Sequence, residues 1–514
     1  MPRLLVAVCL AFAAVAGTLR LRAYDTFWHL AAGRWILAHQ RVPRFDPFRF
    51  TSENTPWVDH EWLFQVWIAV LERLGGVSAL VVARTLLVAG IAALLLRELR
   101  RAGAPLAGAV LVVVVAVLGA RGRFFLRPEL ASLAGVVLLL ALLQRVRRVG
   151  RAGWREVAPL AGLVVLWVNL HPGALLAPLL AAAYLLGARV PWRTVVTLPA
   201  IAALALLANP YGAKVFTVPF GIAAGLRGLP AVNPEWLPVW RAPLPHLLFG
   251  AAALVVLAAL TAVRARRLDA ATGLAALFLA ALAATAVRHQ GLFFLGAAFF
   301  AGECLADLRR ATPPVSARPA RALAPVVALA ACALAALWCV RPPASGPLRP
   351  RQGRLLPGLG LEPGRFPENA VDRLERLRGV GRLYNDVAFG GYLLWRLYPP
   401  RRVFIDSRNE VRPDLLHELA RARADERAWR ALLDRYRIDA ALVRNDRRLR
   451  PLVTLDAAGR PARVEHLPEY AVLFPRDRFA LVYADEVALL FLRRTAARAA
   501  AGGAITPARP GPSE

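Results

Sequence analysis

Residues suited to proton transfer lie early in the chain, in two short stretches. Asp25 and His29 stand four positions apart, and His60 is followed directly by Glu61. A carboxylate or an imidazole beside an attacking hydroxyl or amine can accept its proton, which is general base catalysis. Asp25 is the first candidate for this base and Glu61 is the second, while His29 and His60 are candidate substrate contacts.

Further polar side chains stand at the ends of later apolar runs. A guanidinium group can hold a phosphate through parallel hydrogen bonds and neutralise the charge that develops on a leaving group. Arg127 and Arg288 are therefore the candidate clamp for a phosphate. The other candidate substrate contacts are Glu129, His171, Asn209, Glu235 and His289.

Each of these residues taken singly also has a purely structural explanation. Asp25 could cap a helix that starts at Thr26, the two arginines could extend to lipid headgroups, and Asn209 could hydrogen-bond between helices. The functional interpretation therefore depends on convergence: one pocket would have to join Asp25 to Arg127 and Arg288.

The elements that must position these residues are mostly apolar helices. Hydrophobic residues make up 58% of the 514 residues, well above the usual share in a soluble domain. Runs of about 16 to 20 apolar residues are long enough to cross a hydrocarbon core. We predict a polytopic α-helical membrane protein with about eleven transmembrane helices, at 4–19, 77–96, 105–120, 128–143, 158–170, 174–188, 194–208, 246–263, 270–287, 291–306 and 322–340.

Arginine accounts for nearly all of the net charge of +31, since Lys214 is the only lysine. The arginines gather in alternate short loops instead of forming a basic stripe, so we expect no nucleic-acid partner. By the positive-inside rule, this alternation places all the candidate residues on the extracytoplasmic face. The first run also has features of a signal peptide, and under either reading the residues after Leu21 lie outside the cytoplasm.

The predicted domains follow from this register. Residues 1–340 form the transmembrane domain, which includes a first outer loop, 22–76. Two amphipathic helices in that loop, 26–39 and 60–74, are rich in tryptophan and are expected to lie in the membrane interface. A linker rich in Pro, Gly and Arg (341–378), an extracytoplasmic soluble α/β domain (379–495) and a disordered tail (496–514) complete the chain.

The α/β domain has its own candidates. We predict strands at 382–385, 403–406 and 440–443, a helix at 415–436, a closing hairpin at 479–483 and 488–492, and a turn at Gly390-Gly391-Tyr392. Open α/β sheets place ligand contacts beyond strand ends. An alternative is that Asp406 simply pairs with Arg408 or caps the following loop. The outer-domain candidates are Asn385, Asp386, Asp406 and Arg408.

Several motifs resemble a group of bacterial membrane proteins placed near the GT-C class of polytopic glycosyltransferases. The class includes protein O-mannosyltransferases, aminoarabinose lipid A transferases and the catalytic subunits of oligosaccharyltransferases. A short first helix followed by a long outer loop with an early acid is similar to its architecture. The motifs are Asp25-Thr26-Phe27-Trp28-His29, Asp59-His60-Glu61-Trp62, Asn169-Leu170-His171-Pro172-Gly173, Asn209-Pro210-Tyr211-Gly212 and the region 385–408.

The resemblance implies that Asp25 is the first-loop acid of such enzymes. Thr26 follows it where an Asp-Glu pair would be expected, and the α/β domain lacks a Trp-Trp-Asp-Tyr-Gly motif. The acceptor and the involvement of a divalent metal are therefore open, and no cofactor is assigned.

These observations predict a membrane glycosyltransferase of the bacterial cytoplasmic (inner) membrane. It would move a sugar from a polyprenyl-phosphate donor in the bilayer to an extracytoplasmic acceptor. One alternative is a transporter or flippase for a lipid-linked or anionic substrate, although such proteins usually show internal repeats and this sequence shows none. Another is a non-catalytic membrane scaffold whose outer domain binds a partner.

Overall fold

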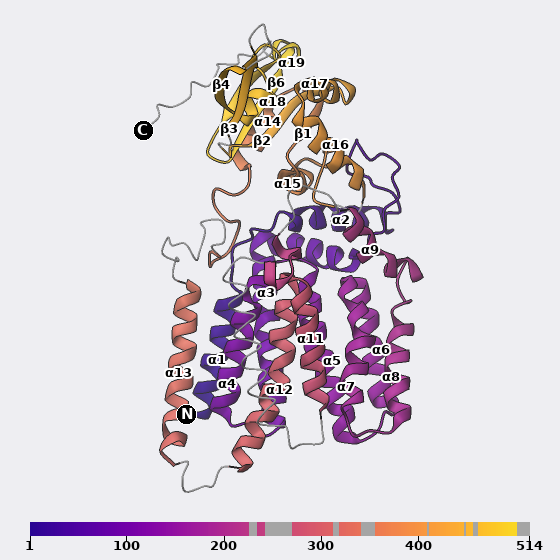
Figure 1. Ribbon diagram of the computed structural model, residues 1–514, viewed down its shortest axis with the longest axis vertical. Coiled ribbons are helices and arrows are strands. Elements are labelled where there is room, and N and C mark those ends of the chain that lie inside the picture. The colour runs from indigo at the N-terminus through magenta and orange to yellow at the C-terminus, as the bar shows by residue number, and fades with distance from the viewer. Residues whose placement is uncertain are drawn as a thin grey trace. The chain divides into compact units, whose positions relative to one another are not determined.

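The computed structural model describes residues 1–225, 234–241, 270–311, 318–340, 355–408, 411–446, 449–455 and 461–500 (Figure 1). The chain divides into two compact units. Unit 1 comprises Met1–Ala23, His60–Thr217 and Ala231–Leu361, and unit 2 comprises Tyr24–Asp59, Val218–Pro230 and Glu362–Glu514. Each unit thus combines segments that are far apart in the sequence.

Unit 1 is a bundle of apolar helices (Figure 1). Short 3-10 turns connect several of them, including η1 (Arg121–Arg123), η2 (Pro172–Leu175), η3 (Gly212–Thr217), η4 (Pro234–Trp236), η5 (Val239–Arg241) and η6 (Val287–His289). The α-helices are α1 (Pro2–Gly17), α3 (Trp62–Arg101), α4 (Leu106–Ala120), α5 (Glu129–Val149), α6 (Trp154–Leu170), α7 (Leu176–Leu186), α8 (Trp192–Ala205), α11 (Ala271–Thr285), α12 (Gln290–Ala311) and α13 (Arg318–Val340).

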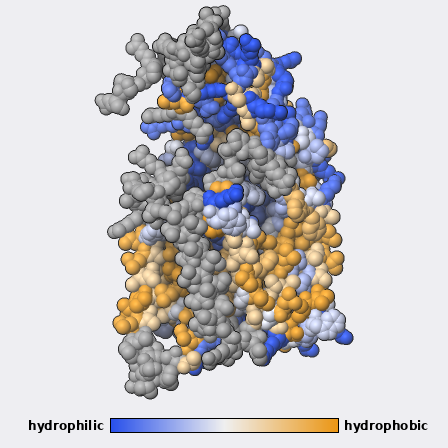
Figure 2. All heavy atoms as spheres, in the orientation of Figure 1, coloured by the Kyte–Doolittle hydropathy of each residue, from blue (hydrophilic) through white to orange (hydrophobic). Residues whose placement is uncertain are grey.

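Apolar side chains cover the outside of this bundle as well as its core. Leu86, Val115 and Leu179 are each more than half exposed, and orange apolar residues spread over the helices of unit 1 on the face shown in Figure 2. Such a surface suits hydrocarbon and not water. The chain is a multi-pass membrane protein.

The predicted apolar runs correspond to helices wherever the structure describes them. Five of the described helices are long and apolar enough to cross a membrane by length and composition: Trp62–Arg101, Leu106–Arg123, Glu129–Val149, Val287–Ala311 and Leu323–Val340. Other apolar helices are shorter, such as the 14-residue α8, and the predicted run 246–263 lies outside the described residues. The total of eleven spans therefore stays a prediction.

Helix α1 contributes to the core of the bundle. Leu5, Cys9 and Phe12 are buried, and α1 packs against α3, α4 and α13. Helix α3 includes most of the amphipathic stretch predicted at 60–74 and continues through the apolar run predicted at 77–96. Its kink lies at Gly75 and Gly76, and Gly76 has a φ of 62° that suits glycine.

Unit 2 contains α2 (Asp25–His39), α9 (Val218–Gly225) and a C-terminal α/β fold. The helices of that fold are α14 (Glu368–Arg376), α15 (Val387–Leu397), α16 (Pro413–Ala424), α17 (Glu426–Arg435), α18 (Glu469–Leu473) and α19 (Arg494–Ala500). Its strands are β1 (Arg382–Asn385), β2 (Ile438–Arg444), β3 (Leu449–Leu455), β4 (Pro461–Pro468), β5 (Phe479–Ala484) and β6 (Ala488–Arg493).

A four-stranded sheet in the order β1-β2-β6-β5 organises this fold. Strands β1 and β2 are parallel, whereas β2–β6 and β6–β5 are antiparallel. Strands β3 and β4 form a separate hairpin. Aromatic side chains of Tyr384, Phe404, Trp429, Phe474 and Phe491 fill the core beside the sheet.

Several predicted elements of the α/β fold differ from those observed. The predicted strand 403–406 has only one isolated bridge, from Val403 to Arg49. The predicted helix 415–436 is broken at Asp425, whose side chain accepts a hydrogen bond from the amide of Ala428 and so starts a second helix. Gly390 and Gly391 lie inside α15 and not in a turn. Strands β3 and β4 were not predicted.

The predicted domain boundaries also differ from the contacts. Residues Tyr24–Asp59 belong with the C-terminal fold and not with the bundle. The predicted linker 341–378 includes α14, whose Ala370, Val371 and Leu374 are buried, and the predicted tail includes part of α19. These segments were predicted from composition, which does not report the apolar stripe of a short amphipathic helix.

Candidate functional site

A first polar cluster in unit 1 lies where α3 begins and α6 ends. Glu61 immediately precedes α3, and its Oε1 lies 3.6 Å from Nε2 of His60 and 3.8 Å from Nε2 of His171. The three side chains are between 6% and 13% exposed. Three of the candidate residues, His60, Glu61 and His171, thus lie together in the structure of this unit.

Hydrogen bonds from α5 and α6 orient the His171 ring. Its Nδ1 accepts a hydrogen bond from the amide of Gly173 at 3.0 Å and lies 2.7 Å from Oγ of Ser132. The Trp167 indole donates to the same Oγ at 2.9 Å, so the Ser132 hydroxyl can in turn donate to His171. Because Nδ1 acts as an acceptor, the ring proton is on Nε2, which faces Glu61.

A second cluster gathers around the start of α5. Arg123 pairs with Glu129, with Nε 3.1 Å from Oε1, and its Nη1 lies 3.1 Å from Oε2 of Glu235. Arg127 approaches the same Glu235 oxygen at 3.5 Å. The Arg123–Glu129 pair is buried, whereas the side chains of Arg127 and Glu235 are 25% and 29% exposed. The buried Arg123–Glu129 pair is thus neutral overall, and Arg127 and Glu235 are the more accessible members of the cluster.

Arg288 joins the two clusters. Its guanidinium lies over the ring of Trp236, 4.3 Å from the centroid, in a cation–π contact. Arg288 also interacts electrostatically with Glu129 and His171. Three arginines, Arg123, Arg127 and Arg288, therefore gather with two glutamates, Glu129 and Glu235, in one region of unit 1.

Two predicted substrate contacts of unit 1 form hydrogen bonds to nearby backbone. Asn209 donates to the carbonyls of Leu206 and Gly212 and accepts from the amide of Tyr211 at 2.8 Å. The Nδ1 of His289 lies 3.1 Å from the carbonyl of Leu282. The Asn209 bonds shape the turn after α8, which is a structural role.

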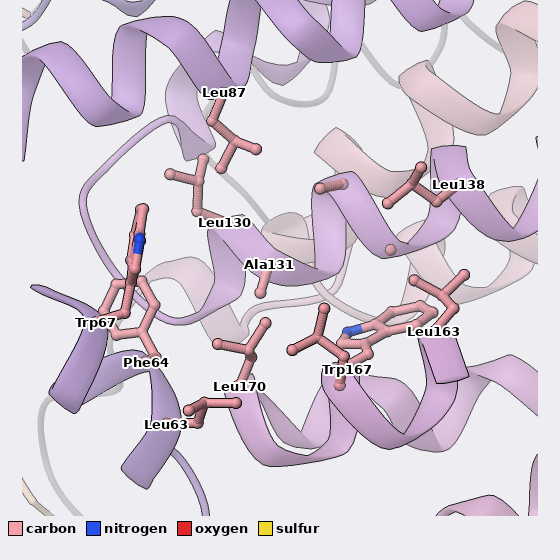
Figure 3. Close-up of a pocket in the computed structure, with 13 residues that line it drawn as sticks. Leu63, Phe64, Trp67, Leu87, Leu130, Ala131, Leu138, Leu163, Trp167 and Leu170 are labelled. Atoms are coloured by element: carbon pink, nitrogen blue, oxygen red, sulfur yellow. The ribbon is translucent and has the colours of Figure 1, made fainter. Parts of the chain in front are cut away.

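An apolar groove with a volume of about 410 Å³ opens beside the first cluster. Figure 3 shows the rings of Phe64, Trp67 and Trp167 and the side chains of Leu130 and Leu163 around it. Its full lining is Leu63, Phe64, Trp67, Leu87, Leu130, Ala131, Ala134, Gly135, Leu138, Leu163, Leu166, Trp167 and Leu170.

Several residues that line the groove are close in sequence to the polar residues of the clusters. Leu63 lies two residues after Glu61, Leu130 directly follows Glu129, and Leu170 directly precedes His171. Trp167 has both roles, since its ring lines the groove and its indole nitrogen donates to Ser132. Unit 1 therefore places the apolar groove next to charged groups.

Asp25 lies in unit 2, at the first position of α2. Oγ of Ser407 donates to its Oδ1 at 2.5 Å, and no side-chain cap bond is made at the start of this helix. His29, one turn later, is buried with its ring 3.5 Å from the Trp28 ring, centroid to centroid. Asp25, in the first turn of α2, thus makes a long-range contact to Ser407 that the sequence did not indicate.

Asp406 and Arg408 form a buried ion cluster with residues of the first loop. Nη2 of Arg408 lies 2.6 Å from Oδ2 of Asp406 and 2.9 Å from Oδ1 of Asp46, and Arg49 also pairs with Asp406. Burial alone would raise the pKa of Asp406. The charges of Arg408 and Arg49 outweigh it and hold the pKa below its usual value. The alternative of a structural pair is therefore the one observed, enlarged by Asp46 and Arg49.

Asn385 and Asp386 also hold backbone. The Asn385 amide donates to the carbonyl of Ile405 at 2.7 Å and accepts from the amide of Phe404 at 2.9 Å. Asp386 accepts from the amide of Arg444 at 2.7 Å and from Arg423 at 3.1 Å. All four outer-domain candidates thus fasten segments of unit 2 to one another.

Sequence reasoning missed several residues that complete these clusters, among them Asp46, Arg49, Arg123, Ser132 and Ser407. Arg123 stands one helical turn before Arg127, and Ser407 stands between two candidates, so spacing could have indicated both. Ser132 had no signal, because serine is common in helices. Among the residues that the structure describes, no group of three or more His, Cys, Asp or Glu side chains is arranged to hold a metal ion.

No protein-family model matches the chain, and no curated protein matches its sequence. Solved structures do share its fold. The oligosaccharyltransferase AglB from Archaeoglobus fulgidus, in complex with an inhibitory peptide and a dolichol-phosphate, has a TM-score of 0.53 at 10% identity and covers 90% of this chain and 74% of its own. The apo form of the A. fulgidus enzyme gives a TM-score of 0.54 at the same identity and coverage.

ArnT from Cupriavidus metallidurans, bound to undecaprenyl phosphate, has a TM-score of 0.51 at 14% identity. The match covers 95% of this chain and 97% of ArnT. At such identities the likeness concerns the fold, and it extends over nearly the whole length of both chains.

Proposed function

We propose that this chain, which has the fold of the GT-C class of membrane glycosyltransferases, transfers a sugar from a polyprenyl-phosphate donor to an acceptor. The reaction would take place at the extracytoplasmic face of a bacterial cytoplasmic membrane. The observation that carries the proposal is the apolar groove of unit 1, which runs beside clustered arginine, glutamate and histidine side chains.

The groove suits the hydrocarbon part of such a donor. A prenyl chain is apolar and unable to hydrogen-bond, so it is best accommodated by side chains that expose no polar atoms. The leucines and aromatic rings that line the groove meet this need. The fold neighbours support this assignment, since AglB was solved with a dolichol-phosphate and ArnT with undecaprenyl phosphate.

The arginines suit the phosphate part. Arg123 is buried and paired with Glu129, so it mainly holds the cluster together. Arg127 and Arg288 are half-buried and are the groups that a phosphate could reach. Two guanidinium groups would neutralise the negative charge that grows on the phosphate oxygen as the bond to the sugar breaks.

Asp25 would supply the base. An acceptor hydroxyl or amine attacks the anomeric carbon of the sugar, a new carbon–oxygen or carbon–nitrogen bond forms, and the bond from that carbon to the phosphate oxygen breaks. Polyprenyl phosphate leaves with the bonding electrons, and the acceptor proton passes to the Asp25 carboxylate. The role of Asp25 in this reaction stays a prediction from the sequence. Glu61, oriented by His171, is the second candidate for the base.

The test uses the full chain in a host strain that lacks its own copy. Membranes carry the native donor and acceptor, and release of polyprenyl phosphate is measured by mass spectrometry. We expect Asp25→Asn to lower the release about a hundredfold or more, because general base catalysis contributes about 10² to 10⁴. Asp414→Asn, at a carboxylate that is 72% exposed, is the matched control and should leave the release unchanged.

Two results would contradict the proposal in different ways. If wild-type protein adds no release of polyprenyl phosphate over the empty strain, the transferase activity is wrong. If release is normal in Asp25→Asn and lost in Glu61→Gln, the activity stands and Glu61 takes the place of Asp25 as the base.

A further inference from the structure

We infer that Ser407 is a positioning residue for Asp25, and that the C-terminal α/β fold exists in part to present it. The inference rests on the proposed function and deepens it, since it assigns the C-terminal fold a part in the same reaction. It concerns residues of unit 2 alone.

The direct observation is a short hydrogen bond between distant parts of the chain. Oγ of Ser407 donates to Oδ1 of Asp25 at 2.5 Å, although 382 positions separate the two residues. Both side chains are half-buried. A hydroxyl donor fixes the rotation of a carboxylate, and a catalytic group held in one orientation is more effective than a mobile one.

Ser407 is itself held by its two neighbours. Asp406 and Arg408 are about 1% exposed, and their side chains pair with each other and with Arg49 and Asp46. Arg408 also lies over the ring of Trp57, 4.6 Å from the centroid. A serine between two immobilised residues has little freedom, so its hydroxyl is presented at a fixed point.

The segment just before Ser407 is fastened in the same way. The Asn385 side chain bonds to the carbonyl of Ile405 and the amide of Phe404. These bonds connect the end of β1 to the segment that leads into Ser407, so the sheet and the serine are mechanically joined.

Helix α15 contacts both partners of the hydrogen bond through its two glycines. A Cβ on Gly391 would lie 2.7 Å from the carbonyl oxygen of Tyr24, the residue before Asp25. A Cβ on Gly390 would lie 2.1 Å from the carbonyl oxygen of Ile405 and 2.7 Å from Cα of Asp406. Only glycine permits these approaches. The glycine pair thus sets the backbone beside Asp25 and the backbone beside Ser407 against one helix.

These contacts explain a set of residues that the proposed chemistry does not use. Asn385, Gly390, Gly391, Asp406 and Arg408 have no need of a ligand of their own, because each supports the position of Ser407 or of α2. The geometry therefore assigns the C-terminal fold a positioning role toward the catalytic base.

The test compares Ser407→Ala with Ser407→Thr in the membrane assay of polyprenyl phosphate release. We expect the alanine variant to lose about tenfold to a hundredfold of the maximal rate, as expected for a misplaced catalytic group. Threonine keeps the hydroxyl and should restore most of the rate.

Two controls separate positioning from folding. Ser78→Ala, at an exposed serine of α3, should leave the rate unchanged. The apparent melting temperature in detergent should be the same for Ser407→Ala and Ser407→Thr within a few degrees. An alanine variant with a wild-type rate would overturn the inference.

A second measurement tests the contact without any activity. In a background where Cys9, Cys304, Cys332 and Cys339 are replaced, Asp25→Cys with Ser407→Cys should form an intramolecular disulfide on mild copper-phenanthroline oxidation, while either cysteine alone should not. Absence of the cross-link in folded protein would overturn the inference even if Asp25→Asn is inactive. Cross-linking together with a fully active Asp25→Asn would instead refute the role of Asp25.

Discussion

In the candidate clusters, the buried acidic residues are held by arginines. In unit 2, Asp406 is shared by Arg49 and Arg408, and Arg408 also reaches Asp46. Removal of one member of a buried ion pair leaves an uncompensated charge, which costs about 3 to 5 kcal/mol. The pairing therefore links residues of the first outer loop to the C-terminal fold through charge and not only through apolar contact.

The pH dependence of stability tests this pairing. Because the folded-state pKa of Asp406 is lowered, its stabilising contribution is complete above the unfolded-state value of about 4 and is lost as the pH falls below it. We expect wild type to be more stable than Asp406→Asn by about 3 to 5 kcal/mol at pH 7. The difference should shrink by about 1.4 kcal/mol per pH unit below pH 4. Thermal unfolding of detergent-purified protein at pH 7 and pH 3 measures it. A difference that is the same at both pH values would show that charge pairing is not its cause.

Among the elements of unit 1, α5 connects the polar clusters to the groove. Its first turn carries Glu129 and Ser132, and Leu130 to Leu138 include five of the groove-lining residues. Its last turns carry Arg147 and Arg148. Arg147 pairs with Glu303 of α12, and Arg148 pairs with Glu98 of α3. One helix thus has a polar start, an apolar groove-lining middle and a basic end.

A substitution in the middle of α5 separates the groove from the polar clusters. Ala134 lines the groove, and the larger side chain of Ala134→Phe should obstruct part of it. We expect the retention of added undecaprenyl phosphate, measured by native mass spectrometry, to fall about tenfold, which corresponds to about 1.4 kcal/mol. Val115→Phe, at a residue of α4 that is 58% exposed, is the control. Equal retention by wild type and Ala134→Phe would show that the lipid chain binds elsewhere.

At the scale of the whole molecule, the chain returns to residues that it left hundreds of positions earlier. Unit 2 joins Tyr24–Asp59 to Glu362–Glu514, with most of the apolar helices between them in sequence. The side of the membrane on which each loop lies depends on the number of spans that precede it. The arginine-rich ends of α3 and α5 favour the cytoplasm for that end of the bundle.

Labelling of single cysteines tests this topology. The four native cysteines are buried, so they should contribute little background labelling, and they can be replaced to remove the rest. With eleven spans, Glu53→Cys should react with an impermeant maleimide in intact spheroplasts, and Arg151→Cys should react only after permeabilisation. Both wild-type side chains are exposed. The reverse pattern would invert the orientation and remove the proposed site from the extracytoplasmic face.

Local sequence sufficed for the features that depend on local physics. Long apolar runs determined where most helices lie, and short apolar runs indicated β1, β2 and the β5–β6 hairpin. The length of an apolar run is a property of consecutive residues, so it can be read without a fold. The likeness to a membrane glycosyltransferase architecture came from the same level, through the order of helices and the early acid.

Only the tertiary structure decided which distant residues meet. The contact of Ser407 with Asp25 and the pairing of Arg49 with Asp406 span hundreds of positions. The glycines at 390 and 391, which local reasoning placed in a turn, lie inside α15. They are glycines because the backbone of Tyr24 and Ile405 approaches the helix too closely for a Cβ. Such contacts are selected by packing between elements, and neighbouring residues carry no signal for them. The sequence by itself thus determined the membrane bundle and its polar candidates, whereas their grouping into separate clusters was a property of the folded chain.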